Sequence, residues 1–274
     1  MAARHDPRRT PALPAWALAL AVAGLLVAGL PVLALVVRAD WGHLGADLTS
    51  AGAASALWLS LTTAACATLA CVVLGVPLAL VLAGGRGFGT SLLRAIVLIP
   101  LVLPPLVGGL ALLALLGRHG LLGGPLASAT GLALPFTTAA VVIAQTFVAL
   151  PFLVVSVEGA LRGRDPGDAR AAASLGASPS RVFWTVTLPA LAPALRAGIV
   201  LSFARALGEF GATALFAGNL PGVTQTMPLA IYAAFNGAGV SRGAATALAL
   251  LLVVCAVVLL AASGQLMRSG GRRP

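Results

Sequence analysis

The sequence predicts an all-α membrane protein with six transmembrane helices, and its composition and its apolar runs support this fold class. Of the 274 residues, 59% are hydrophobic and only 9% are charged, and the mean hydropathy is +1.04. Soluble domains usually carry about 25% charged residues. A helix needs about 20 mostly apolar residues to cross the hydrocarbon core, and six windows of the chain meet this requirement. We therefore interpret the chain as an integral membrane protein.

The six predicted spans follow one another along the chain. They cover about residues 12–37, 53–83, 91–116, 132–157, 191–217 and 244–265. Arginines precede the first span, as in a secretory signal peptide, but its apolar run exceeds the roughly 7–15 residues of such a signal and no clean cleavage site follows. We expect this helix to be retained.

Prolines within the third span predict an irregular helix. Pro100, Pro104 and Pro105 each remove a backbone donor, which a membrane helix tolerates where other groups satisfy the freed carbonyls. We expect a broken or kinked helix that faces protein or a cavity. A simple kink without a transport role is the alternative.

The positions of the arginines, which are the only basic residues besides histidine, predict the orientation of the chain. Twelve of the 17 arginines fall in the tails and in the loops on the same side as the tails, namely at positions 4, 8, 9, 86, 94, 162, 164, 170, 181, 268, 272 and 273. Only Arg38, Arg118 and Arg242 fall on the other side. Cytoplasmic loops carry an excess of basic residues. We therefore expect cytoplasmic tails at residues 1–11 and 268–274, and a transmembrane domain over residues 12–267, in a bacterial plasma (inner) membrane.

Few side chains in the sequence are suited to catalysis or metal binding. Cys66, Cys71 and Cys255 lie in apolar segments without metal-ligand spacing, and the three histidines lie in a tail and two loops. We expect no catalytic residue, metal site or bound cofactor, and an intramembrane enzyme would need a reactive cluster that is missing here. A secondary transporter would show internal repeats, and we find no convincing one. The net charge of +10 comes from arginines at helix ends, so we expect no binding to nucleic acid.

The polar interval at residues 158–198 is too long and too patterned for a simple connector. Asp168 and the alanines that follow it favour a short helix from about Pro166, and Gly176 is a typical helix stop. Ser178, which Pro179 follows, is a typical cap for a second helix.

The second helix of this interval carries Phe183, Trp184 and Val186 on one predicted apolar face. Small alanines permit close packing and aromatic side chains supply anchors, which is typical of a docking element for a cytosolic partner. An amphipathic helix on the lipid surface is the alternative.

The segment AAASLGASPSRVFWTVTLP resembles the EAA loop of the membrane subunits of ABC importers. Gly176 is followed after nine residues by Val-Thr-Leu-Pro at 186–189, which matches the Ile-x-Leu-Pro of the family with Val for Ile. The departure is Arg170, which stands where the family usually has Glu; Asp168 lies two residues earlier. The resemblance assigns coupling to the ATPase to Asp168, Arg170, Ala171, Ala172, Gly176, Ser178, Phe183, Trp184 and Pro189.

The resemblance covers about residues 50–265 and implies the type I ABC importer permease fold, with a cytoplasmic coupling helix in a loop at about residues 164–189. It also implies a second copy of the chain, two ABC ATPase subunits and an extracytoplasmic binding protein as partners, beside membrane lipid. The sequence contains no Gly-rich loop of the kind that cradles ATP phosphates. ATP and Mg therefore belong to the separate ATPase chain, and the present chain is not expected to be an enzyme.

Arg205 and Glu209 lie four residues apart in the predicted fifth span. A charge at membrane depth costs about 3 kcal/mol or more, so we expect the two side chains to pair on one helix face and to point into the bundle or a water-filled pathway. A pair that only packs helices together and a pair that contacts a translocated anion are both open interpretations.

Residues 202–232 resemble the fifth span and following loop of molybdate importer permeases. Phe-Gly-Ala-Thr at 210–213 and Thr-Gln-Thr-Met-Pro-Leu at 224–229 favour molybdate, or tungstate, over the related sulfate and thiosulfate permeases, which remain the alternative. The loop at 217–242 is expected to form an outer gate and a dock for the binding protein, or else to be a solvated loop. The predicted pathway and gate residues are Arg205, Glu209, Thr213, Asn219, Thr224 and Gln225.

Overall fold

The structure is a computed structural model that describes residues 14–165 and 167–270, without the side chains of residues 260 and 262–270. The chain divides into two units, residues 1–41 and 42–274. The predicted N-terminal tail with its three arginines, Pro166, and the last four residues with Arg272 and Arg273 lie outside the described residues.

The first unit contains one helix, α1 (Ala15–Val37), which is the predicted first span. Its mean hydropathy is 2.7, and none of its residues is buried. The indole Nε1 of Trp41 donates a hydrogen bond to the carbonyl oxygen of Val36 just beyond the helix end (3.1 Å).

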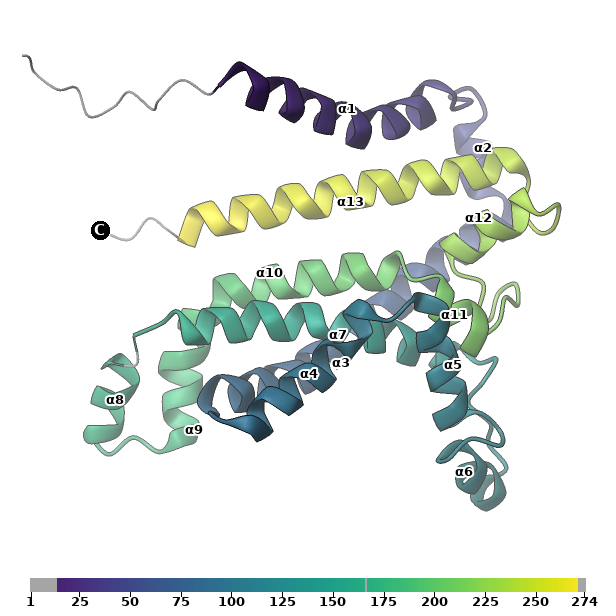
Figure 1. Cartoon of the computed structure of the whole chain (residues 1–274). Coiled ribbons are helices and arrows are strands. Elements are labelled where there is room, and N and C mark those ends of the chain that lie inside the picture. The colour runs from purple at the N-terminus through teal and green to yellow at the C-terminus, as the bar shows by residue number, and fades with distance from the viewer. Residues whose placement is uncertain (1–13, 166, 271–274) are drawn as a thin grey trace, which may run out of the picture. The chain divides into compact units, whose positions relative to one another are not determined.

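The second unit is helical throughout its regular elements. The elements are α2 (Leu44–Thr49), α3 (Ala51–Gly84), α4 (Phe88–Val102), α5 (Pro105–Leu116), α6 (Gly123–Thr130), α7 (Thr138–Arg162), α8 (Gly167–Ser174), α9 (Pro179–Val182), the π-helical turn η1 (Phe183–Thr187), α10 (Leu188–Leu207), α11 (Gly211–Phe216), α12 (Met227–Phe235) and α13 (Arg242–Gly270) (Figure 1). Within residues 14–165 and 167–270, five helical segments are long and apolar enough to cross a membrane, and there are six if the bent pair of α4 and α5 is counted as one span. This agrees with the six predicted spans.

The third span is broken. Helices α4 and α5 meet at an angle of 119°, and Leu103 and Pro104 form the break. Pro104 precedes Pro105 at the first position of α5, where proline is favoured because its missing N–H is not needed. The expectation of a broken or kinked helix is therefore confirmed, and the break is far sharper than a simple kink.

Two other predicted spans have wrong boundaries. The fourth begins at Thr138 rather than 132, because Thr137 caps its N-terminus by accepting the N–H of Ala140 (3.2 Å). The fifth is not continuous to 217, since α10 ends at Leu207 and α11 begins at Gly211. Apolarity alone did not reveal either boundary, because apolar residues continue on both sides of the Thr137 cap and of the short Gly208–Phe210 break.

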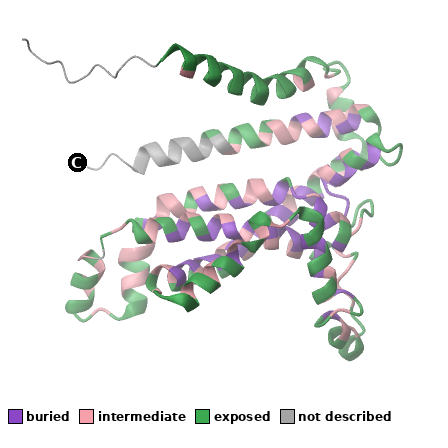
Figure 2. Ribbon diagram, in the orientation of Figure 1, coloured by how far each residue is buried: buried purple, intermediate pink, exposed green. Residues whose placement is uncertain are grey.

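Helix α7 packs against both α3 and α10, and these three helices carry much of the core (Figure 2). Lipid tails are as apolar as leucine, so small residues and hydrogen bonds must hold membrane helices together. The Ser202 hydroxyl donates to the carbonyl of Ala149 (3.2 Å), and the Ser156 hydroxyl donates to that of Ala194 (2.8 Å). These bonds join α7 to α10.

The two broken spans pack against each other through glycines. A Cβ atom at Gly109 of α5 would lie 2.9 Å from the carbonyl oxygen of Ala212 and 2.9 Å from the Cβ of Leu215, both on α11. A Cβ atom at Gly211 would lie 2.6 Å from the Cβ of Pro105. Only glycine permits this approach of the two short helices.

We expect Gly109→Ala to destabilise the protein by about 1–3 kcal/mol, the usual cost of overpacking. The matched control is Gly89→Ala on α4, where a Cβ atom would meet nothing within 4 Å. There the better helix propensity of alanine should stabilise the protein by up to about 1 kcal/mol. Thermal unfolding of the purified chain in detergent measures both, and equal midpoints for the two variants would contradict the close contact.

Candidate functional site

The helix–turn–helix segment at residues 164–189 has the structure that its sequence predicts. Helix α8 ends at Ser174, and Gly176 adopts a φ of +84°, which favours glycine. The N–H of Ala177 then donates to the carbonyl of Ala172 (3.1 Å). The Ser178 hydroxyl accepts the N–H of Arg181 (3.3 Å) and thereby caps the next helix. The predicted helix stop and cap are both confirmed.

The second helix of this segment is joined to the fifth span through the π-helical turn, where the helix axis changes direction (Figure 1). Helix α9, the turn η1 and α10 form one helical stretch of 29 residues, Pro179–Leu207. The segment therefore lies at one end of α10, whereas α11 and α12 lie beyond the other end (Figure 1).

The aromatic pair of the segment does not share one face as predicted. Adjacent residues of a helix point about 100° apart, and Phe183 is half-buried against the core while Trp184 is 63% exposed. The two rings still touch edge to face, with centroids 5.1 Å apart and planes at 74°. Phe183 anchors the segment to its own bundle, and Trp184 is the anchor that a partner can reach.

The apolar side chain that the sequence reading missed is Leu175. It is 89% exposed and precedes the glycine at the apex of the turn, where an apolar residue has no intramolecular packing to gain. An apolar residue in an otherwise polar turn is a signal that could have been read from the sequence. Among the predicted coupling residues, Ala171, Gly176, Ser178 and Pro189 are also exposed, and Ala172 is half-buried.

The charged residues of this segment pair with each other. Arg164 contacts Asp168 (3.6 Å), and Arg170 contacts Asp165 (3.6 Å). Both carboxylates and Arg170 are largely exposed, so these ion pairs contribute little to stability. Arg170, at the position where the resemblance leads one to expect Glu, is thus accompanied by an acidic neighbour in its own loop.

Behind the turn lies an apolar cavity of about 430 Å³ between α3, α8 and the second helix. Leu80, Ala173, Val182 and Phe183 are among the residues that line it. The cavity separates α8 from the bundle, so the outer face of the segment is the one that projects from the protein.

The intramembrane pair forms as predicted, although Glu209 lies beyond the end of α10. Arg205 Nη1 is 2.8 Å from Glu209 Oε2, and the side chain of Glu209 is 1% exposed while that of Arg205 is 28% exposed. The other carboxylate oxygen of Glu209 accepts the N–H of Ala212 at the start of α11 (2.8 Å). Glu209 therefore links the two halves of the broken fifth span.

This geometry gives the two charges different roles. Glu209 is buried and uses one oxygen to cap α11 and the other to hold Arg205, so it stabilises the break. The side chain of Arg205 remains partly exposed, unlike that of Glu209. Thr213, a turn further on, is fully buried, and its hydroxyl has no hydrogen-bond partner within the described residues.

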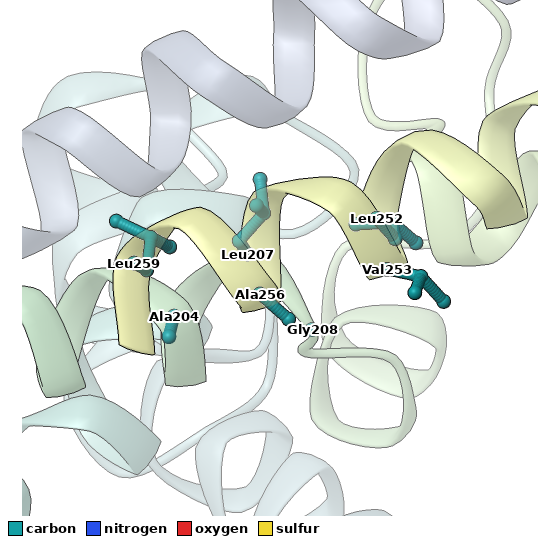
Figure 3. A pocket seen from close by; sticks show the side chains of 7 residues that line it. All are labelled: Ala204, Leu207, Gly208, Leu252, Val253, Ala256 and Leu259. Atoms are coloured by element: carbon teal, nitrogen blue, oxygen red, sulfur yellow. The ribbon is translucent and has the colours of Figure 1, made fainter. Parts of the chain in front are cut away.

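The groove next to this pair is apolar. It lies between α10 and α13, has a volume of about 270 Å³, and is bordered by the small residues Ala204, Gly208 and Ala256 together with leucines (Figure 3). Figure 3 shows these side chains around the groove without any polar group among them. The groove suits a hydrocarbon rather than an anion.

The remaining predicted gate residues form a separate group. Asn219 is exposed, whereas Thr224 and Gln225 are buried, and the Thr224 hydroxyl accepts the N–H of Leu220 (2.9 Å). Within the described part of the chain, no hydrogen bond or ion pair connects them to Arg205. The predicted external loop is also not irregular throughout, because α12 occupies its middle, and the N–H of Met227 donates to the Ser60 hydroxyl of α3 (2.7 Å).

Sequence reasoning missed a second buried carboxylate, Glu158. It lies near the end of α7 and binds two arginines: Arg94 Nε at 3.1 Å and Arg162 Nε at 2.9 Å from its Oε1. Arg162 also donates to the carbonyl of Leu82 (3.0 Å). The i, i+4 spacing of Glu158 and Arg162 was visible in the sequence, but Arg94 comes from 64 residues earlier and only the fold brings it there.

Comparison with known proteins agrees with this architecture. The family model described as "Binding-protein-dependent transport system inner membrane component" matches residues 72–268. The "Molybdenum transport system permease protein ModB" of Mycobacterium tuberculosis is 50% identical over 252 residues, which cover 92% of this chain and 94% of that protein. A "Probable sulfate transport system permease protein cysT" of Zygnema circumcarinatum is 34% identical over 240 residues, 86% of this chain and 83% of that protein.

Among solved structures, the chain resembles one in the "Crystal structure of a bacterial ABC transporter involved in the import of the acidic polysaccharide alginate". The TM-score is 0.67 at 17% identity, over 93% of this chain and 94% of that chain. The likeness confirms the type I ABC importer permease fold. The chain therefore belongs to the family of binding-protein-dependent transport system inner membrane components.

Proposed function

We propose that this chain is the transmembrane permease subunit of an ATP-driven ABC importer and translocates molybdate, or the similar dianion tungstate. The observation that carries the transport role is the helix–turn–helix segment, which projects Leu175 and Trp184 from one end of a membrane bundle. The 50% identity to a molybdenum transport permease over 92% of the chain supports molybdate as the cargo.

The proposed partners follow from two features of the chain, the lack of a phosphate-binding loop and the exposed turn around Gly176. Its sequence has no phosphate-cradling loop, so ATP and Mg bind to a separate ATPase, and the present chain contributes movement rather than catalysis. Two ATPase subunits, a second copy of the chain and an extracytoplasmic binding protein complete the proposed importer. The exposed turn around Gly176 is the surface that each ATPase subunit contacts.

The orientation in this proposal follows the arginine distribution. Arg86 and Arg164 lie in the loops that follow α3 and α7, Arg162 ends α7, and Arg94 and Arg170 lie within α4 and α8. Basic residues mark the cytoplasmic side. Both termini are therefore cytoplasmic in a bacterial plasma membrane, and the loop that carries Asn219 is extracytoplasmic.

The break between α10 and α11 is the proposed place where the cargo meets the chain. Arg205 supplies a partly accessible positive charge there, and Glu209 keeps it in place. Thr224 and Gln225 are buried within the extracytoplasmic loop. They shape the outer gate through the turn that they stabilise rather than by direct contact.

The identity of the cargo is tested by measuring the rate at which the reconstituted complex hydrolyses ATP. The complex is assayed with its binding protein loaded separately with molybdate, tungstate or sulfate. We expect stimulation by the molybdate- and tungstate-loaded protein and none by the sulfate-loaded protein. Unloaded binding protein is the control. Stimulation by sulfate alone would replace the cargo with sulfate, the alternative that the 34% identity to a sulfate permease favours.

A further inference from the structure

A small polar cavity lies where α3 ends and α4 begins. It has a volume of about 190 Å³ and is lined by Arg86, Thr90, Ser91, Arg94 and Arg162, together with two glycines. In the proposed function these arginines mark the cytoplasmic side, but none of these side chains contacts the cargo or the ATPase.

The cavity carries an excess of positive charge. Three arginines line it, and Glu158 is the carboxylate that bonds to this cluster within the described residues, so the formal excess is 3 − 1 = +2. Glu158 holds Arg94 and Arg162, whereas Arg86 is exposed and has no ion-pair partner in the described part of the chain. An anion entering the cavity therefore meets a charge that the protein has not neutralised.

Further donors surround the same space. Gly87, with a φ of +96°, precedes the 15-residue helix α4 and provides no side-chain cap for the N–H groups of its first turn. Thr90 also lines the cavity, while the Ser91 hydroxyl donates to the carbonyl of Gly87 (3.2 Å). Guanidinium, hydroxyl and free N–H donors together match a tetrahedral oxyanion such as phosphate.

An exposed apolar flank begins at the mouth of this cavity. Phe88 is 84% exposed, and Leu92, Ile96 and Ile99 continue along one face of α4 as exposed side chains. A soluble anion would gain nothing from such a flank, whereas a phospholipid has its phosphate and its acyl chains in this arrangement. Basic pockets between membrane helices are known to bind anionic lipid headgroups.

We propose that the cavity around Arg86 binds the phosphate headgroup of an anionic phospholipid, whose acyl chains lie along the exposed flank of α4. The excess of positive charge selects an anionic lipid over a zwitterionic one. This site is separate from the cargo pathway. If the lipid does not bind here, the proposed transport function is unaffected.

The test is lipid retention by the purified full-length chain, measured by native mass spectrometry after exchange into phosphatidylcholine with graded amounts of phosphatidylglycerol. We expect wild type to retain phosphatidylglycerol preferentially and Arg86→Gln to bind it about fivefold more weakly, the usual effect of one basic residue near an anionic surface. Arg86 is exposed, so the variant should fold. The matched control is Arg118→Gln, an exposed arginine beyond the other end of the α4–α5 pair, which should retain the lipid like wild type.

Three results would overturn the proposal. Arg86→Gln could retain phosphatidylglycerol as wild type does, or Arg118→Gln could lose it equally. Alternatively, excess inorganic phosphate could displace the retained lipid, which would identify a soluble anion as the ligand.

Discussion

Replacement of Glu209 by alanine is expected to destabilise the chain by about 3 kcal/mol and to abolish uptake. The variant leaves Arg205 without its partner at membrane depth, and removal of one member of a buried pair costs about 3–5 kcal/mol. Because Arg205 is partly exposed, the lower end of this range applies. The N–H of Ala212 also loses its acceptor. Thermal unfolding in detergent, the yield of assembled complex and cargo uptake in proteoliposomes measure the effect.

The control for this prediction is Glu209→Gln. Glutamine retains an oxygen that can accept the N–H of Ala212, but it loses the charge that holds Arg205. We expect a stability between those of wild type and Glu209→Ala. If the glutamine and alanine variants are equally unstable, the cap on α11 contributes nothing, and wild-type uptake and yield in Glu209→Ala would remove any special role for this carboxylate.

Replacement of Gly176 by proline is expected to abolish the stimulation of ATP hydrolysis by loaded binding protein. Proline fixes φ near −65°, and the turn requires +84°. The N–H of Gly176, which donates to the carbonyl of Ala173 (3.0 Å), would also be lost. The projecting segment would then lose the geometry that presents Leu175 and Trp184 to the ATPase. The measurement is ATP hydrolysis by the assembled complex with and without loaded binding protein.

Two further variants separate backbone geometry from surface contact. A side chain at position 176 would meet nothing within 4 Å, and asparagine tolerates a positive φ better than most residues, so Gly176→Asn should retain most of the stimulation. Trp184→Ala leaves the turn intact but removes an exposed anchor, and it should uncouple the complex. Unchanged stimulation in both Gly176→Pro and Trp184→Ala would defeat the docking assignment.

The fold was largely predictable because its strongest signals are local. Apolar runs located the spans, and glycine, serine and proline at 176, 178 and 179 located the projecting turn. The break after Leu207 was missed although Gly208, at the end of α10, is a typical helix stop, because the prediction followed the apolar run on to residue 217. The separate directions of Phe183 and Trp184 could have been inferred, because adjacent residues of a helix point about 100° apart.

The site was only partly predictable because long-range pairings are invisible in one sequence. Arg205 and Glu209 share a helical spacing, so their contact could be inferred. The bond between Arg94 and Glu158 joins α4 to α7, and no spacing rule connects them. The need for glycine at position 109 was likewise not predictable, because it depends on the close approach of α11 in the folded chain.

Helix α10 (Leu188–Leu207), which follows the coupling segment, has a mechanical consequence. At about 1.5 Å per residue, its 20 residues form a rod about 30 Å long. A hydrogen-bonded helix resists compression along its axis, so a push at its first residues arrives almost undiminished at its last. The force therefore arrives at the break between α10 and α11, which Glu209 links. There the two helices must either change their relative angle or separate.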